Sequence, residues 1–389
     1  MTRIVPALDL SDEALAAVTA QLAETAAEYD QSGAIPVRGL EVVHRAGLLT
    51  ATVGSQYGGA GAGPRETARI LTALGEGDPS VALIAANTLM AHASQAANAH
   101  WPVGLYEEAL ARSAVEPSPI NAIRAEPELG APARGGLPRT TALRTSSGWI
   151  VNGHKAYATG GPALAYHVVW VVADEPGGDP DSPRVGHVIV PGDRAGITWI
   201  DTWDHLGLRA SNTHDVVYDG VLVPEDAFVE IPRGADGVYR DPAAAAGPNS
   251  FGHPALYLGV ARAARRAFAD FARSRVPAAL GRPIATTERI QAVAGEIDLQ
   301  IAQAETLLHG ALLLIEAGDQ TVLPQLSVIK VAIARAVVAA VQTAVAALGN
   351  PGLSRRNSLE RHLRDVLCVR VHPPQEDAAL AAAGRRVLG

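Results

Sequence analysis

Polar and apolar residues alternate with a helical period in the first part of the chain. Residues 9–31 carry apolar side chains three and four positions apart behind Ser11, and residues 64–77 repeat this pattern behind Pro64. A serine side chain accepts a hydrogen bond from the free amides that begin a helix, and proline suits the first turn. The pattern therefore predicts two helices, within an N-terminal helical domain that we place at residues 1–117.

After residue 117 the pattern changes to short runs rich in β-branched and aromatic residues. Turn sequences such as Asn-Gly and Pro-Gly-Asp separate the runs, because glycine and proline favour tight turns and interrupt strands. The runs occupy residues 140–145, 148–153, 166–174, 184–190, 196–201 and 215–223. This spacing predicts a domain at residues 118–232 that is an antiparallel sheet or a small barrel.

The helical period returns in a third domain, which we place at residues 240–389. Helices are predicted at residues 253–276, 286–317, 323–348 and 356–367. Long helices joined by short turns are typical of a bundle, so the whole chain is expected to be an α+β protein. The segment 331–348 is apolar on nearly all sides, but Arg335, Gln342 and Thr343 interrupt it, whereas a membrane span needs ~18 apolar residues. We expect a buried helix or one at a subunit interface.

Charge and cysteine content exclude several classes of partner. The net charge of −8 and the pI of about 5.8 argue against binding to nucleic acid or to an anionic membrane surface. Cys368 is the only cysteine, so an internal disulfide is impossible, and the spacing of the twelve histidines indicates no metal site. The first residues lack the apolar segment of a signal peptide, so we expect a cytoplasmic protein.

Four motifs are spread over nearly the whole chain. Residues 47–63 (GLLTATVGSQYGGAGAG) end in a Tyr-Gly-Gly turn, and residues 148–164 carry Gly-aromatic-x-x-Asn-Gly-x-Lys-x-x-x-Thr. Residues 206–226 carry Gly-x-Arg-x-Ser-x-Thr, and residues 358–366 (SLERHLRDV) end in an Arg-Asp pair. In this order the motifs resemble the acyl-CoA dehydrogenase superfamily. The resemblance implies an N-terminal helical domain, a middle antiparallel β domain and a C-terminal four-helix bundle.

The resemblance also implies a flavin cofactor, FAD or alternatively FMN. A flavin ring needs a flat wall on one side and polar groups at its edges. Tyr157 and Thr159 stand where the family sets an aromatic ring and a hydroxyl against the flavin. Glu126 and Gly130 match the loop along the other side of the flavin, where glycine allows the backbone to approach closely.

A homo-oligomer, either a tetramer or a dimer, is implied as well. In the family, a helix in the last third of the chain sends an arginine to the flavin pyrophosphate of a neighbouring subunit. Arg273 or Arg275 is the candidate for this role here, because a planar and permanently charged guanidinium suits a pyrophosphate.

The catalytic base of the family is missing. Dehydrogenation of an acyl thioester needs a carboxylate to take the α proton, and the family's two positions for it align with Pro373 and Asn249. A branch of the superfamily, the two-component flavin monooxygenases, receives reduced flavin from a separate reductase and has an Arg-Asp pair, a spacer and a histidine at this turn. Residues 364–377 (RDVLCVRVHPPQED) are similar, so His372 becomes the candidate catalytic residue, an imidazole poised to exchange a proton near neutral pH.

Three functions remain open from the sequence. The favoured one is a flavin-dependent monooxygenase or oxidase acting on a small organic molecule, or on one tethered as an acyl-CoA or carrier thioester. The second is an acyl-CoA dehydrogenase whose base is displaced to Glu376, three residues beyond the vacant position. The third is a flavin- or acyl-binding protein without catalysis, because Ala131 and Pro132 replace the Ser-Asp that follows glycine in the family's loop.

Overall fold

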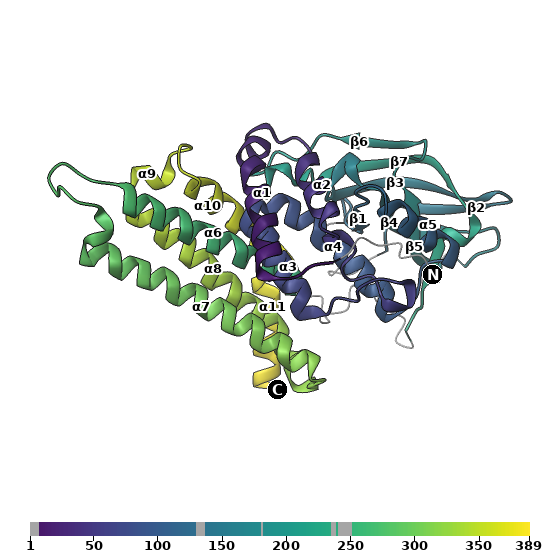
Figure 1. Ribbon diagram of the computed structural model, residues 1–389. Coiled ribbons are helices and arrows are strands. Elements are labelled where there is room, and N and C mark those ends of the chain that lie inside the picture. The colour runs from purple at the N-terminus through teal and green to yellow at the C-terminus, as the bar shows by residue number, and fades with distance from the viewer. Residues whose placement is uncertain (1–7, 130–136, 180–181, 235–238, 240–250) are drawn as a thin grey trace.

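The chain folds into a sheet domain and a helical bundle with the first helices between them (Figure 1). The computed structural model describes residues 8–129, 137–179, 182–234, 239 and 251–389. In Figure 1 the strands lie at one end of the molecule and the long C-terminal helices extend to the other. The order of helices, strands and helices along the chain agrees with the α+β prediction.

Three of the N-terminal helices begin at a residue that favours a helix start, either a capping side chain or a proline. Helix α1 begins after Ser11, whose Oγ accepts a hydrogen bond from the Ala14 amide at 3.2 Å, and α3 begins at Pro64, as predicted. Helix α4 was not predicted; Asp78 caps it by accepting from the Ser80 amide at 2.9 Å. The helices are α1 (Asp12–Ser32), α2 (Val37–Arg45), α3 (Pro64–Gly77), α4 (Pro79–Ala97) and α5 (Val103–Ser113).

Within the described residues, eight strands form one sheet in the order β6-β7-β3-β2-β4-β5-β8, with β1 paired to β4. They are β1 (Ile120–Ile123), β2 (Thr141–Thr145), β3 (Gly148–Ala158), β4 (Tyr166–Asp174), β5 (Val185–Pro191), β6 (Ile197–Ile200), β7 (His214–Val223) and β8 (Phe228–Ile231). Five of the seven strand pairings among the described residues are antiparallel, as predicted, but β4 pairs in parallel with both β1 and β2. Side chains alternate with the same period in both kinds of pairing, so the sequence pattern cannot distinguish them.

The C-terminal domain is the predicted four-helix bundle with two additional helices. The four are α6 (Gly252–Ser274), α7 (Glu288–Glu316), α8 (Leu326–Leu348) and α10 (Leu359–Leu367), joined by α9 (Asn350–Leu353) and followed by α11 (Glu376–Leu388). The stretch Gln320–Leu348 has the length and hydropathy of a membrane span, yet 61% of its most apolar window is buried. We interpret it as a core helix of the bundle, as the sequence suggested.

Two glycines bring the N-terminal domain and the bundle into backbone contact. A Cβ atom on Gly75 of α3 would lie 2.0 Å from the Leu256 carbonyl oxygen, and one on Gly259 of α6 would lie 2.1 Å from the Thr72 carbonyl oxygen. Helices α3 and α6 therefore cross more closely than any larger side chain would allow. One apolar core runs through both domains as a result, which fixes α6 relative to α4.

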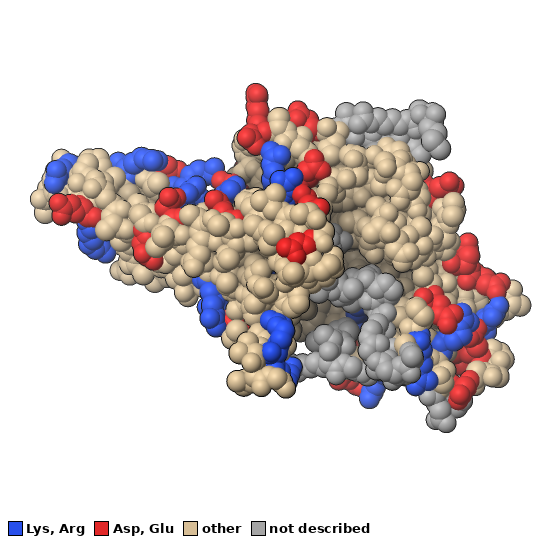
Figure 2. All heavy atoms as spheres, turned by 90° about the horizontal axis from the view of Figure 1, so that it is seen from below, with Lys and Arg blue, Asp and Glu red and all other residues tan. Residues whose placement is uncertain are grey.

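Charged side chains are mixed in sign on the surface. On the face drawn in Figure 2, basic and acidic side chains of the described residues lie interspersed rather than in a continuous basic stripe. Several pair across helices: Arg262 of α6 lies 2.7 Å from Glu305 of α7, and Arg265 lies 2.5 Å from Asp298. This face lacks the electrostatic footprint of a nucleic-acid-binding protein.

Candidate active site

Strained backbone marks the edge of the sheet at which β3 ends and β7 begins. Tyr157, Leu208 and Asn212 have φ angles of 59°, 52° and 47°, in the left-handed region that side chains disfavour. Tyr157 lies near the end of β3, where the pairing with β7 shifts between Lys155 and Ala158. The other two flank a short 3₁₀ turn, η5 (Arg209–Ser211), that leads into β7. Strained residues of this kind gather at functional sites, so this edge is a candidate site.

The bulge in β3 turns Tyr157 outward and Thr159 inward. The Tyr157 side chain is 60% exposed, which is unusual for an aromatic residue in a strand. Thr159 is buried; its amide donates to Asn121 Oδ1 at 3.1 Å, and its hydroxyl accepts from Thr213 Oγ1 at 3.1 Å. Ser211 Oγ lies 2.7 Å from the same Thr213 hydroxyl. An aromatic ring and a row of hydroxyls are the kinds of group that the wall and the polar edge of a flavin site need.

Glu126 lies under this edge and is paired with a lysine. Its carboxylate accepts hydrogen bonds from Lys155 Nζ at 2.8 Å, from Thr140 Oγ1 at 2.7 Å and from the amide of Arg139 at 2.8 Å. Burial alone raises the pKa of Glu126, but the bonds from Lys155 and Thr140 outweigh it and leave the pKa below its usual value. Glu126 therefore fastens residues 139–140 to β3. Gly130, the other predicted residue of this loop, lies outside the described residues.

The second half of the candidate site is the turn after α10. His372 Nε2 lies 2.7 Å from the Tyr257 hydroxyl, and its ring stacks on His253 with 4.3 Å between centroids and 10° between planes. His253 and Tyr257 are one turn apart on α6, so they present one face to the turn. Burial, helped by His253 and Lys330, lowers the pKa of His372 well below its ordinary value. The imidazole is therefore neutral at physiological pH.

Glu376, the predicted alternative base, lies at the first position of α11. Its Oε1 accepts from Arg335 Nε at 3.0 Å and from Arg335 Nη2 at 2.5 Å. Both side chains are substantially exposed. The carboxylate is directed to α8 and is held there by a two-pronged ion pair. Asn249, aligned with the other base position of the family, lies outside the described residues.

A direct contact joins the two halves. Asp365 of α10 accepts a hydrogen bond from the strained Leu208 amide at 2.8 Å, and a Cβ on Gly207 would lie 2.3 Å from the Arg364 carbonyl oxygen. Burial raises the pKa of Asp365 to about 7. The loop that carries Ser211 is thus seated on the helix that leads to His372. We infer that the hydroxyl row and the imidazole are held in a fixed relation.

Arg273 and Arg275 lie far from both halves. Arg273 is in the last turn of α6, 3.3 Å from Asp270, and Arg275 caps that helix. Figure 1 shows this end of α6 at the tip of the bundle, opposite the sheet. Neither guanidinium is placed to serve a flavin on its own sheet, so the predicted pyrophosphate contact requires a second subunit.

The structure also identifies residues that sequence reasoning missed. His253 and Tyr257 were given no role in the site, and Asp365 was noted only as part of the Arg-Asp pair. The spacing of His253 and Tyr257 was a usable signal, because positions i and i+4 share a helix face. Among the described residues, no group of three or more His, Cys, Asp or Glu side chains is placed to hold a metal ion.

Comparisons with known proteins agree with this architecture. Models of the acyl-CoA dehydrogenase N-terminal, middle and C-terminal domains match residues 7–105, 122–221 and 249–373. The chain belongs to the acyl-CoA dehydrogenase family, and the predicted three-part fold is confirmed. YdbM of Bacillus subtilis (strain 168) is 29% identical over 374 residues, which cover 95% of this chain and 94% of YdbM.

One further relative and one solved structure are also similar to this chain. The amino sugar nitrososynthase RubN8 of Streptomyces rubradiris is 32% identical over 263 residues, covering 66% of this chain and 59% of RubN8. The crystal structure of TdsC from Paenibacillus sp. A11-2 with FMN and indole superposes with a TM-score of 0.83 at 21% identity, covering 97% of this chain and 96% of TdsC. At this identity the superposition establishes the fold alone.

Proposed function

We propose that this protein is a flavin-dependent monooxygenase, or a related oxidase, that uses reduced flavin and O2 on a small organic substrate. One observation carries the proposal: in the turn after α10, Pro373 stands at the family's carboxylate position, and the neighbouring His372 places an imidazole against Tyr257 and His253. The imidazole is supported by Tyr257 and His253 and is neutral, so it can accept a proton.

The chain's own residues have a limited task in this reaction. One atom of O2 enters the substrate and the other leaves as water, while bound reduced flavin supplies two electrons and is oxidised. His372 accepts a proton from an N–H or O–H group of the substrate, and Tyr257, 2.7 Å away, orients the ring or relays that proton. Tyr157 and the hydroxyls of Thr159 and Thr213, which are bonded to each other, would hold the flavin at the edge of the sheet.

The relatives suggest the kind of substrate and cofactor. RubN8 is named for nitroso formation on an amino sugar, and the TdsC structure contains indole and FMN. We therefore favour a nitrogen-containing or hydroxylated small molecule over a thioester-tethered one. FMN and FAD are both compatible with an exposed aromatic wall, and a separate reductase is the proposed source of reduced flavin.

A true acyl-CoA dehydrogenase is the second candidate. YdbM is named as an acyl-CoA dehydrogenase, and it matches this chain over nearly the full length of both proteins. In that case Glu376 must leave Arg335 and turn toward the substrate. Acyl-CoA would then bleach the oxidised flavin without oxygen, and Glu376→Gln would abolish the bleaching while flavin stays bound. A protein without catalysis, the third candidate, would show neither bleaching nor oxygenation.

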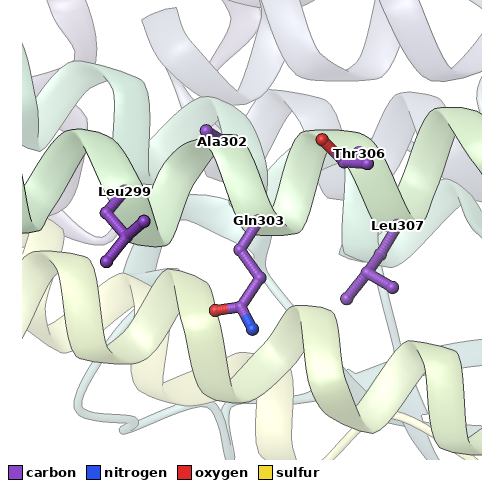
Figure 3. A pocket seen from close by; sticks show the side chains of 5 residues that line it. All are labelled: Leu299, Ala302, Gln303, Thr306 and Leu307. Atoms are coloured by element: carbon purple, nitrogen blue, oxygen red, sulfur yellow. The ribbon is translucent and has the colours of Figure 1, made fainter.

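We further propose that the protein is a homo-oligomer that associates through α7. Leu299, Gln303 and Leu307 project from one face of α7 and line a shallow groove of about 490 Å³ (Figure 3). Leu299 and Leu313 are 63% and 50% exposed, which is unusual for leucines on a long helix. A neighbouring subunit on this face would cover them.

The test is rapid mixing of flavin-loaded, photoreduced protein with oxygenated buffer. A transient absorbance unlike that of reduced or oxidised flavin, lasting longer than with free flavin, supports the monooxygenase. His372→Ala should shorten this transient and release hydrogen peroxide, whereas His100→Ala, at a partly exposed position on another domain, should not. Featureless reoxidation, combined with anaerobic bleaching by acyl-CoAs, would establish the dehydrogenase instead.

A further inference from the structure

Lysine is rare in this chain and is used only in the interior. Of 32 basic residues only Lys155 and Lys330 are lysines, and every other one is an arginine. Their side chains are 0% and 4% exposed, although lysine is among the residues least often buried. An ammonium group places three donors on one compact atom, whereas a guanidinium spreads its donors over a plane. An ammonium therefore suits a place where several acceptors converge on a point, as they do at Lys330.

At Lys330 the acceptors are three backbone carbonyls of the turn that carries His372. Lys330 Nζ, from α8, donates to the carbonyl oxygens of His372 at 2.9 Å, Pro374 at 3.1 Å and Val369 at 3.3 Å. All three protons of the ammonium are used. The turn begins in the 3₁₀ segment η11 (Cys368–Arg370) and ends at α11, so the bonds span its length.

The turn has little other means of holding its shape. Residues 373 and 374 are both proline, which has no amide hydrogen to donate. Val371 donates to the Cys368 carbonyl at 3.2 Å, and the next such bond, from Ala379 to Gln375, already belongs to α11. The ammonium thus replaces the backbone donors that the prolines lack.

We propose that Lys330 is a positioning residue: it gathers the carbonyls of the turn and thereby fixes the His372 ring against Tyr257 and His253. The positioning itself is independent of the reaction; its purpose in proton transfer rests on the proposed function. The ammonium acts through His372 and touches no reacting atom in this arrangement.

The charge of Lys330 adds a second effect to its hydrogen bonds. Burial is the main cause of the lowered pKa of His372, and the positive charge of Lys330 contributes, as does His253. Tyr257 faces the ring from α6, and Glu376 of α11 acts on Lys330 in the opposite sense by favouring its charged form. Removing the ammonium should therefore raise the pKa of His372 as well as loosen the turn.

The experiment measures hydrogen–deuterium exchange by mass spectrometry in the full-length protein. Exchange at the imidazole carbon between the two nitrogens reports the pKa of each histidine, and amide exchange reports the order of residues 368–375. In Lys330→Met we expect the midpoint of the His372 titration, which is the pH at half protonation, to rise by about one pH unit or more toward the ordinary ~6.5. We also expect faster amide exchange in the turn. His362, buried on α10, serves as an internal control that should not move.

Two further variants separate charge from geometry. Lys330→Arg keeps the charge but cannot place three donors on one point, so the His372 midpoint should stay low while the turn exchanges faster. Arg289→Met removes an exposed cation on α7, which bonds to the Ala347 carbonyl instead of the turn, and should change neither measurement. If Lys330→Met does not fold, Lys330→Arg and the native His372 midpoint still decide the matter.

The outcomes distinguish the two proposals. An unchanged His372 midpoint and unchanged amide exchange in the Lys330 variants, or a native midpoint near the ordinary value, overturns the positioning role whatever the activity. A raised midpoint together with full, coupled activity of His372→Ala keeps the positioning role and removes His372 from the reaction. A raised midpoint with an acid limb of kcat/KM displaced to higher pH in Lys330→Met supports both.

Discussion

The Tyr257 hydroxyl lies 2.7 Å from His372 Nε2, although 115 positions separate the two residues in the chain. Tyr257 belongs to the first helix of the bundle, and His372 to the turn that follows the fourth. Burial raises the pKa of the Tyr257 phenol well above its usual value, so the hydroxyl keeps its proton under all physiological conditions. A neutral imidazole and a protonated phenol can form this hydrogen bond with either group as the donor, depending on the tautomer of His372.

Replacing either partner should impair proton transfer to different extents. We expect His372→Ala to lower the oxygenation rate by about 10²-fold, because a positioned acid or base typically contributes this much or more. Tyr257→Phe removes only the hydroxyl and should cost about tenfold, with flavin affinity unchanged. Single-turnover rates and hydrogen peroxide release measure both effects. Full coupling in both variants would contradict a role for this pair.

The buried ion pair beneath the sheet edge gives a test of stability. Lys155→Met leaves the Glu126 carboxylate buried without its cation, so we expect a loss of about 3–5 kcal/mol in the free energy of unfolding. The double variant Lys155→Met with Glu126→Gln removes the charge as well and should recover much of that loss. Denaturant unfolding of the four proteins in the cycle measures the coupling. A loss in the double variant equal to the sum of the losses in Lys155→Met and Glu126→Gln would show that the charges are not coupled.

The main helices and strands could be predicted because apolar residues recur along the sequence with the period of each element. Helices α6, α7, α8 and α10 were predicted within a few residues, and Ser11 and Pro64 begin the helices expected of them. The direction of β4 could not be predicted, because pairing depends on which edge of β2 the chain returns to. Helix α4 was missed because its buried, apolar sequence lacks a polar face that would reveal the helical period.

The sequence could identify site residues that belong to a local motif, but it could not predict contacts between residues that are distant in the chain. His372 and Tyr157 were identified from local sequence. Their surroundings depend on packing between distant segments: Lys330 meets the turn 39 to 44 positions later, and Leu208 meets Asp365 over 157 positions. A count of lysines would have singled out Lys330, but its partners are carbonyls, which no sequence pattern displays.

Tyr157 should show a trade between stability and flavin binding. Its left-handed backbone costs about 1–2 kcal/mol, and its exposed ring contributes little burial in return. Asparagine tolerates this conformation, so Tyr157→Asn should stabilise the protein by up to about 1 kcal/mol while weakening flavin binding about tenfold or more. Tyr157→Phe keeps the ring and serves as the control. Calorimetry and flavin fluorescence measure the two quantities, and undiminished flavin affinity in Tyr157→Asn would remove the ring from the flavin site.

The exposed face of α7 predicts an effect on assembly. Leu299→Glu with Leu313→Glu places two charges on the proposed subunit interface and should yield a smaller species by light scattering after gel filtration. Flavin binding should weaken in parallel if Arg273 or Arg275 serves a neighbouring subunit. Leu222→Glu, at an exposed position on β7, is the matched control. An unchanged mass in the α7 variant would place the interface elsewhere or show that the native protein is a monomer.

Asp365 should make stability depend on pH in a direction opposite to that of most carboxylates. Its folded pKa is about 7, above the unfolded value of about 3.9, so the folded state holds a proton that the unfolded state releases in between. Its contribution to stability is therefore complete below about pH 4 and is lost as the pH rises to 7.

Asp365→Asn keeps an oxygen that can accept from the Leu208 amide and removes the titration. The melting temperature of this variant relative to the native protein should be higher at pH 8 than at pH 5, because only at pH 8 does the native protein carry a buried, ionised Asp365. Asp298→Asn, which loses an exposed carboxylate on α7, should show no such dependence. The same difference for Asp365→Asn at both pH values would mean that Asp365 is already ionised at pH 5, and that the loop carrying Ser211 rests on a charged carboxylate.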